Sequence, residues 1–249
     1  MPQWNHAVVV GASSGLGEAI ARRLAREGTH VSLVARRLEV LEAVAKSING
    51  NLGRECAVAY RADVRNVGES QRTFEEIIET GPPVDLIVYS SGVMPKGSRE
   101  GFPTDEDVSA IATNFTGAVV WLNAAATYFG ERGHGTIVGI GSIAGDRGRQ
   151  GNPVYNATKA GLATYLEALR SRLKPRGVVV VTIKPGLMRT PMLGSRPGFK
   201  PAIRADAAAW LVLKATRKGR RTAYVPPWWA AIAFLIKIMP PQIMERVKT

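Results

Sequence analysis

Apolar and polar positions follow a regular order along the chain, with short apolar runs separated by longer amphipathic stretches. The apolar runs predict buried parallel strands at Ala7–Val10, Val31–Ala35, Cys56–Tyr60, Val84–Tyr89, Thr136–Gly141, Val178–Ile183 and Thr222–Val225. The amphipathic stretches predict helices at Gly17–Glu27, Leu38–Ile48, Glu69–Glu79, Asp105–Phe129, Pro153–Leu173 and Ala205–Arg217. Crossover connections between such strands place helices on both faces of the sheet. We therefore predict the α/β class, as a single-domain, doubly wound (Rossmann-like) parallel sheet.

The length and composition are those of an ordinary globular domain. The chain has 249 residues, of which 45% are hydrophobic and 21% charged, and these values exclude a disordered chain, a collagen and a coiled coil. Cys56 is the single cysteine, so no disulfide can form within the chain, and a reducing compartment is compatible. No secretory signal is visible near the N-terminus. These features predict a cytoplasmic protein.

Basic residues outnumber acidic ones, 33 against 20, which gives a net charge of +13. Such an excess favours anionic partners such as phosphorylated cofactors or anionic lipid, and a solvated basic face is the simpler alternative. The sequence has no zinc-finger spacing, basic recognition helix or aromatic-basic RNA signature. Nucleic acid is therefore not an expected partner.

The C-terminal tail combines apolar, aromatic and basic residues. Its apolar tract, Trp228–Met239, spans 12 residues, whereas a membrane-spanning helix needs about 20. The basic cluster Arg217–Arg221 precedes this tract, and tryptophans beside basic residues favour a membrane interface. Two interpretations stay open. Residues 217–239 make peripheral contact with the inner face of a membrane, or the tail is buried in a homodimer or homotetramer.

A glycine-rich loop follows the first predicted strand. The segment Gly11-Ala12-Ser13-Ser14-Gly15-Leu16-Gly17 leads into an amphipathic helix. Glycines allow a tight turn and a close approach of the backbone to a ligand, and the start of a helix directs free amide hydrogens and a positive dipole at a phosphate. We therefore expect residues 1–227 to form a dinucleotide-binding and catalytic domain, with residues 228–249 as an apolar and basic helical tail.

The end of the second predicted strand favours a phosphorylated ribose. Folds that bind NAD usually carry an acid there, bonded to the ribose 2′-hydroxyl, but this chain has Ala35 followed by Arg36 and Arg37. Guanidinium groups pair with phosphate through two hydrogen bonds. We therefore predict NADP(H) in preference to NAD(H), with two solvated loop arginines as the alternative. Asp63 is a candidate acceptor for the adenine amino group or an ordinary capping aspartate.

A tyrosine and a lysine four residues apart open the long helix after Pro153. Tyr155 and Lys159 lie on one helical face, and a neighbouring ammonium is expected to lower the pKa of a phenol from about 10. Such a phenol exchanges protons near neutral pH. Ser142 follows another strand end, which is where open parallel sheets collect ligand-binding groups.

Together these segments resemble the classical short-chain dehydrogenase/reductase family. The matching segments run in the family's order up to about Met192, namely Gly11–Gly17, Asp63, Tyr89–Gly92, Asn114, Ser142, Tyr155, Lys159 and Pro185–Thr190. One departure is Tyr89-Ser90-Ser91-Gly92, where the family often has Asn-Asn-Ala-Gly. This departure predicts a slightly weaker local sheet rather than different chemistry.

The resemblance implies a role for each matching residue. Tyr155 is the expected proton donor to a carbonyl oxygen, Ser142 polarises that carbonyl, Lys159 holds the nicotinamide ribose, and Asn114 supports a water-linked proton relay. The expected coenzyme-binding residues are Gly11, Ser13, Ser14, Gly15, Leu16, Gly17, Arg36, Arg37, Asp63, Val64, Ser91, Gly92, Tyr155, Lys159, Pro185, Gly186 and Thr190. The family usually places its substrate-covering loop at Pro191–Ala205. No metal site is predicted.

These residues predict an NADPH-dependent oxidoreductase that interconverts a lipophilic ketone or aldehyde and its alcohol, with Tyr155 as the general acid and base. Two alternatives stay open. The first is a nucleotide-sensing binding protein with little turnover, which would need no proton donor. The second is an epimerase or lyase on the same fold, because a fold does not determine its chemistry. An epimerase recycles its coenzyme, so net coenzyme consumption distinguishes it from a reductase.

Overall fold

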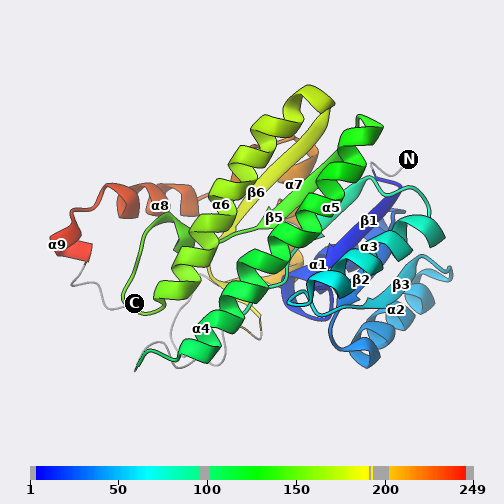
Figure 1. The fold of residues 1–249 in the computed structure, drawn as a ribbon, viewed down its shortest axis with the longest axis horizontal. Coiled ribbons are helices and arrows are strands. Elements are labelled where there is room, and N and C mark those ends of the chain that lie inside the picture. The colour runs from blue at the N-terminus through cyan, green and yellow to red at the C-terminus, as the bar shows by residue number, and fades with distance from the viewer. Residues whose placement is uncertain (1–3, 96–100, 191, 193–201, 245–249) are drawn as a thin grey trace.

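The computed structural model describes residues 4–95, 101–190, 192 and 202–244, and its centre is a seven-stranded parallel sheet (Figure 1). The order across the sheet is β3-β2-β1-β4-β5-β6-β9. The strands are β1 (His6–Val10), β2 (His30–Ala35), β3 (Ala57–Arg61), β4 (Leu86–Tyr89), β5 (Gly135–Ile140), β6 (Val178–Pro185) and β9 (Thr222–Val225). Because β1 pairs with both β2 and β4, the chain reverses its direction across the sheet beside β1. Such a switch point opens a ligand crevice at the carboxyl ends of the strands.

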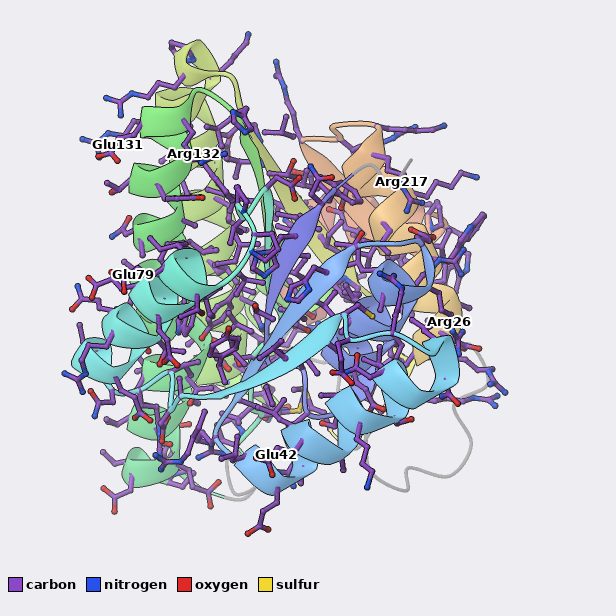
Figure 2. All side chains as sticks on the ribbon, turned by 90° about the vertical axis from the view of Figure 1, so that its right-hand side faces the viewer. Arg26, Glu42, Glu79, Glu131, Arg132 and Arg217 are labelled. Atoms are coloured by element: carbon purple, nitrogen blue, oxygen red, sulfur yellow. The ribbon has the colours of Figure 1, made fainter. Side chains whose placement is uncertain are left out.

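Two helical layers cover the sheet, as the hydrophobic pattern predicts. One layer holds α1 (Gly15–Arg26), α2 (Leu38–Leu52) and α7 (Ala205–Arg217), and the other holds α3 (Val67–Thr80), α5 (Gly117–Arg132) and α6 (Pro153–Leu173). Side chains alternate between the two cores along each strand. In β1, Val9 packs under the first layer and Val10 under the second. The charged side chains labelled in Figure 2 lie on the outer parts of the molecule, around this sheet.

The sequence predicted one long helix over Asp105–Phe129, and the structure confirms a helical stretch over Thr104–Arg132, with a bulge that the sequence did not predict. The structure divides that stretch into α4 (Thr104–Ile111), a turn of π-helix named η2 (Ala112–Thr116), and α5. Asn114 lies in the π-turn and is fully buried. The apolar period continues through the bulge, so the pattern alone does not reveal it. π-Bulges often occur at functional sites.

The remaining elements are short. They are β7 (Met188–Arg189), β8 (Ile203–Arg204), the 3₁₀ turns η3 (Ile143–Asp146) and η4 (Lys174–Arg176), and the C-terminal helices α8 (Trp229–Ile238) and α9 (Pro241–Met244). The strands β7 and β8 pair with each other outside the main sheet, and the apolar pattern did not predict them. Most of the predicted substrate-covering loop, Pro191–Ala205, lies outside the described residues.

The C-terminal helix α8 extends away from the sheet toward one end of the molecule (Figure 1). Trp229 and Ala233 face inward and are buried, while other apolar side chains of α8 are exposed. The basic cluster Arg217–Arg221 comes before β9 and α8 comes after it, so the two halves of the predicted membrane-contact segment lie at opposite ends of that strand.

One stretch within the described residues, Thr104–Arg132, is long and apolar enough to cross a membrane by composition. It comprises α4, η2 and α5, and α5 contributes a row of fully buried side chains to the core beneath the sheet. Helix α8 is apolar but falls in the shorter class of 10–17 residues.

Candidate active site

The glycine loop connects the end of β1 to α1. Gly11 has a φ of +92° and Gly15 a φ of +63°, a region that favours glycine. A Cβ on Gly11 would lie 2.6 Å from the backbone nitrogen of Ser91, so the loop packs directly against the segment after β4. Ser14 is the N-cap of α1 and makes no side-chain cap hydrogen bond. This arrangement presents the first turn of α1 to a phosphate.

Two arginines at the end of β2 lie beside this loop. Arg36 and Arg37 are both exposed, and Arg37 Nη2 donates to Ser13 Oγ at 3.5 Å. No salt bridge is recorded for either arginine among the described residues. The structure therefore brings the Arg37 guanidinium to Ser13, while Arg36 acts on the pKa of Asp63 through its charge.

Asp63, at the end of the third strand, has a partner that sequence reasoning missed. Arg65 Nη2 donates to Asp63 Oδ2 at 2.6 Å, and Arg65 Nε donates to Oδ1 at 3.0 Å. These hydrogen bonds are the main reason that the pKa of the Asp63 carboxyl lies below its ordinary value. The carboxylate is therefore ionised and already held in place, with Val64 buried next to it.

Ser142 and Tyr155 meet at the carboxyl end of β5. Ser142 caps η3 by accepting a hydrogen bond from Ala144 N at 3.0 Å. Tyr155 lies in the first turn of α6, which begins at Pro153, a residue suited to a first helical turn. The Tyr155 and Ser142 side chains are close enough to interact, and Ser142 opposes the rise in the pKa of the Tyr155 phenol. The predicted pair of hydroxyl groups is thus assembled by one strand end and one helix start.

The electrostatics of Tyr155 differ from the sequence-based expectation. Burial raises the pKa of the Tyr155 phenol, and the hydrogen bond from Ser142 and the positive charge of Arg149 oppose that rise. The ammonium of Lys159 instead donates to the Ile140 carbonyl at 3.0 Å and lies 5.8 Å from the centroid of the Tyr155 ring. The phenol therefore carries its proton at neutral pH. Sequence reasoning missed Arg149, which no local motif identifies.

Lys159 is itself perturbed, because its side chain is enclosed by the fold. Its residue is 4% exposed, and burial lowers the pKa of its ammonium to about 8. A Cβ on Gly92 would lie 3.3 Å from Lys159 Nζ, so glycine at that position leaves room for the lysine. At pH 7 the group is still mostly charged, and it loses its proton just above the physiological range.

Asn114 holds the segment after β4 against the catalytic helix. Its Oδ1 accepts from Val93 N at 2.7 Å, and its Nδ2 donates to Val93 O at 2.9 Å and to Thr158 Oγ1 at 3.2 Å. The π-turn η2 carries this side chain. Asn114 therefore fixes the Ser91–Val93 segment beside Lys159. Nearby, Tyr89 OH donates to Thr113 O at 2.6 Å, a main-chain contact made by the residue that departs from the family pattern.

The segment Pro185–Thr190 begins where β6 ends. Gly186 N donates to Val225 O at 2.9 Å, and a Cβ on Gly186 would overlap the indole of Trp229. The tail residue Trp229 thus packs on the backbone of a predicted coenzyme-binding residue. Thr190 is half-buried, and no side-chain partner is recorded for it among the described residues. Sequence reasoning assigned Trp229 to the tail and did not place it at this site.

With this geometry described, comparisons with known proteins identify the class. The family model "short chain dehydrogenase" matches residues 5–199. An uncharacterized oxidoreductase of Myxococcus xanthus is 32% identical over 244 residues, covering 96% of this chain and 94% of that protein. The human 3-oxoacyl-[acyl-carrier-protein] reductase is 34% identical over 185 residues, covering 74% of this chain and 76% of that protein.

A solved structure agrees with these relatives. A single-substitution variant of actinorhodin polyketide ketoreductase with NADPH superimposes with a TM-score of 0.80 at 27% identity, covering 90% of this chain and 97% of that one. The fold and these relatives define a Rossmann-like oxidoreductase acting on a CH–OH or C=O group. The chain belongs to the short-chain dehydrogenase/reductase family.

Proposed function

We propose that this protein is an NADPH-dependent carbonyl reductase in which Tyr155 is the general acid. The observation that carries the proposal is the arrangement of the half-buried Ser142 with the buried Tyr155 and Lys159 at one strand end. The Tyr155 phenol interacts with Ser142, and burial raises its pKa and so keeps it protonated. A protonated phenol is the form that reduction needs, because the carbonyl oxygen must gain a proton as its carbon is reduced.

The residues present fit a bound dinucleotide. The N-terminus of α1 has no side-chain cap, so its amide hydrogens are available for a pyrophosphate. In this proposal Lys159 would hold the ribose hydroxyls of the nicotinamide half, and the segment that carries Pro185, Gly186 and Thr190 would face the nicotinamide. When bound, NADPH supplies the hydride for the carbonyl carbon.

The chain's own residues then complete the reaction. Ser142 binds the carbonyl oxygen and polarises it. Tyr155 donates its proton to the same oxygen as negative charge develops there. Lys159 stabilises the phenolate that remains, and Asn114, which is held next to Lys159, supports the return of a proton to the tyrosine. Oxidation of the alcohol runs through the same groups in reverse.

We propose that the coenzyme preference is for NADP(H). The support is local, since Arg36 and Arg37 are exposed at the end of β2 and Arg37 reaches Ser13 of the phosphate loop. Ala35 stands where an NAD enzyme usually carries an acid. The actinorhodin ketoreductase structure also contains NADPH. A 2′-phosphate is therefore attracted here rather than repelled.

The proposed substrate is a lipophilic ketone or aldehyde. Val93 and Ala144 are apolar, and their backbone nitrogens donate to Asn114 Oδ1 and Ser142 Oγ. We propose that their side chains form walls of the substrate site. The human relative's name specifies a 3-oxoacyl substrate on a carrier protein. A 3-oxoacyl thioester is accordingly one member of the substrate class to be tested.

A carbonyl panel tests this function directly. Purified protein is mixed with NADPH and, separately, with aliphatic ketones, aromatic aldehydes and 3-oxoacyl thioesters, and coenzyme absorbance is followed. We expect at least one lipophilic carbonyl to consume NADPH in stoichiometric amounts, with alcohol as the product. Tight NADPH binding without any consumption would favour the nucleotide-sensing alternative. Product formation without net NADPH loss would favour an epimerase or lyase.

We further propose that α8 contacts a lipid surface. The exposed side of α8 carries Phe234, Leu235 and Ile238, which are 62%, 58% and 61% exposed. The chain as a whole has a charge of +13. An exposed apolar helix face on a chain of positive net charge suits contact with an anionic lipid surface.

Vesicle flotation tests this contact. Full-length protein is expected to float with vesicles that contain phosphatidylserine, and a variant with Phe234→Glu and Leu235→Glu is expected to remain at the bottom of the gradient. Failure of the wild type to float removes the proposal. In that case, a concentration-dependent dimer that the same double substitution dissolves would assign the face to a second copy of the chain.

A further inference from the structure

A buried carboxylate outside the predicted catalytic set joins three neighbouring elements. The side chain of Asp146 is 1% exposed. Its Oδ1 is 2.5 Å from Lys184 Nζ and 3.1 Å from Lys237 Nζ, and its Oδ2 accepts a hydrogen bond from Tyr224 OH at 2.9 Å. The partners lie at the ends of β6 and β9 and on α8. We call these four residues the Asp146 cluster.

The position of Asp146 connects this cluster to the catalytic residues. It ends η3, the turn that Ser142 caps. Within that turn, a Cβ on Gly145 would lie 2.6 Å from the backbone carbonyl carbon of Lys159. Thus η3 packs directly on the backbone of the catalytic lysine. A movement of Asp146 would therefore be passed to Ser142 on one side and to Lys159 on the other.

Among the partners of Asp146, Lys184 lies on the side of the site where we propose that the coenzyme binds. Lys184 immediately precedes Pro185 and Gly186, and its ammonium is held between Asp146 and the ring of Tyr224, 5.9 Å from the ring centroid. Gly186 is in turn covered by Trp229 of α8. The cluster thereby fixes the strand end from which the predicted nicotinamide-binding segment departs.

Another partner, Lys237, attaches α8 to the same carboxylate. Lys237 reaches Asp146 with its ammonium, and Arg147 Nη1 donates to the Lys237 carbonyl at 2.8 Å. Asp146 and Arg147, which are adjacent at the end of η3, therefore both hold Lys237 of the tail. The Asp146 hydrogen bond is also among the reasons that the pKa of the Lys237 ammonium is raised.

An ordinary buried ion pair is weak evidence of stability, because desolvation offsets much of the attraction. Here two ammonium groups face one carboxylate, so removal of the carboxylate leaves two cations unbalanced beside η3. We propose that Asp146 is a positioning residue, which holds Ser142 and Lys159 in register with the Pro185–Thr190 segment and makes that register depend on the attachment of α8. This inference rests on the proposed reductase function.

The test separates rate from binding and folding. In Asp146→Asn the charge is lost and the shape is kept. We expect kcat, measured on folded protein, to fall at least tenfold, while the NADPH dissociation constant stays within threefold. The melting temperature should also fall, because two ammonium groups lose their carboxylate. Asp206→Asn is the matched control, since Asp206 is an exposed acid paired with Arg204. A folded Asp146→Asn enzyme with wild-type kcat would overturn the positioning role.

A double-mutant cycle tests the link to α8. Lys237→Met removes one arm of the cluster from a half-exposed position, and we expect it to lower kcat about threefold. In the Asp146→Asn background the same change should add nothing, because the arm acts through the carboxylate. Independent, multiplying losses would overturn the link.

Two single variants keep the proposal testable if Asp146→Asn does not fold. Lys237→Met and Tyr224→Phe each remove one partner from the carboxylate. Lower kcat in both, with unchanged NADPH affinity, supports the proposal, and wild-type kcat in both overturns it. The wild-type carbonyl assay is run first. Absence of turnover there contradicts the proposed function, whereas failure of the variants alone contradicts only the role of Asp146.

Discussion

Lys159 and Ile140 form the contact that sets the character of the catalytic centre. The lysine Nζ donates to the main-chain carbonyl of Ile140 at 3.0 Å, within a fully enclosed site. This hydrogen bond ties α6 to the end of β5, the strand that leads to Ser142. The Lys159 ammonium therefore bonds to the main chain of Ile140 and, in the proposed function, also to the coenzyme.

This contact leads to a prediction about the pH dependence of coenzyme binding. The pKa of the Lys159 ammonium is lowered to about 8, so the charged form dominates below pH 8 and is lost above it. We expect the NADPH dissociation constant to rise about tenfold between pH 7 and pH 9.5, because hydrogen bonds from a charged donor are the stronger ones. Fluorescence titration measures it. Lys159→Met should bind more weakly without that inflection, and an unchanged inflection would assign it to another group.

Substitution of Tyr155 by Phe should separate chemistry from binding. The variant loses the proton donor but keeps the ring, so we expect kcat to fall roughly 10²- to 10⁴-fold, with NADPH affinity within threefold. Tyr165→Phe is the matched control on the same helix, since Tyr165 OH donates to Asn123 Oδ1 at 2.8 Å, in an exposed contact. Its kcat should remain within twofold. A Tyr155→Phe enzyme that keeps a tenth of the wild-type rate would contradict the general-acid assignment.

The two arginines after β2 should determine the coenzyme preference. In an Arg36→Ala, Arg37→Ala double variant we expect KM for NADPH to rise roughly 10- to 100-fold, because charge-assisted hydrogen bonds to the 2′-phosphate are lost. KM for NADH should change less than threefold. Arg172→Ala, an exposed arginine on α6, serves as the control. Equal effects on the two coenzymes would show that these arginines do not read the 2′-phosphate.

His6 should make the fold sensitive to mild acid. Its ring is fully buried between Pro82 O at 2.6 Å and Ser32 Oγ at 2.8 Å, and burial lowers the pKa of the imidazole from 6.5 to about 4. As the pH falls, His6 gains a proton in the unfolded state before it does so in the folded state. The stability that the neutral imidazole contributes above pH 6.5 is therefore lost as the pH falls toward 4. From pH 7.5 to pH 5 we expect the free energy of unfolding to drop by about 2 kcal/mol from this group.

Urea unfolding of His6→Asn checks the acid sensitivity. The variant should be less stable at neutral pH but show a smaller drop between pH 7.5 and pH 5. The control is His134→Gln, at an exposed residue whose ring contacts the Arg132 carbonyl. Parallel pH profiles for wild type and His6→Asn would place the acid sensitivity elsewhere.

The sequence by itself determined the layout of the fold and the identity of most residues at the proposed site. Continuous apolar runs such as Ala7–Val10 are buried on both faces of a parallel sheet. The glycines at positions 11 and 15 follow from local backbone conformation, since both have a positive φ. Such features depend on neighbours in the chain, so a pattern of residues reveals them.

The tertiary structure alone decided the electrostatics and the role of the tail. The direction of the Tyr155 pKa depends on burial and on Arg149, and the π-turn at Asn114 depends on contacts with Val93 and Thr158. Asp146 and Lys237 are 91 positions apart in the sequence, yet their side chains share one buried ion cluster. Charge–charge energies and desolvation depend on distances in space and on exclusion of water. Both quantities exist only after packing has placed distant segments together.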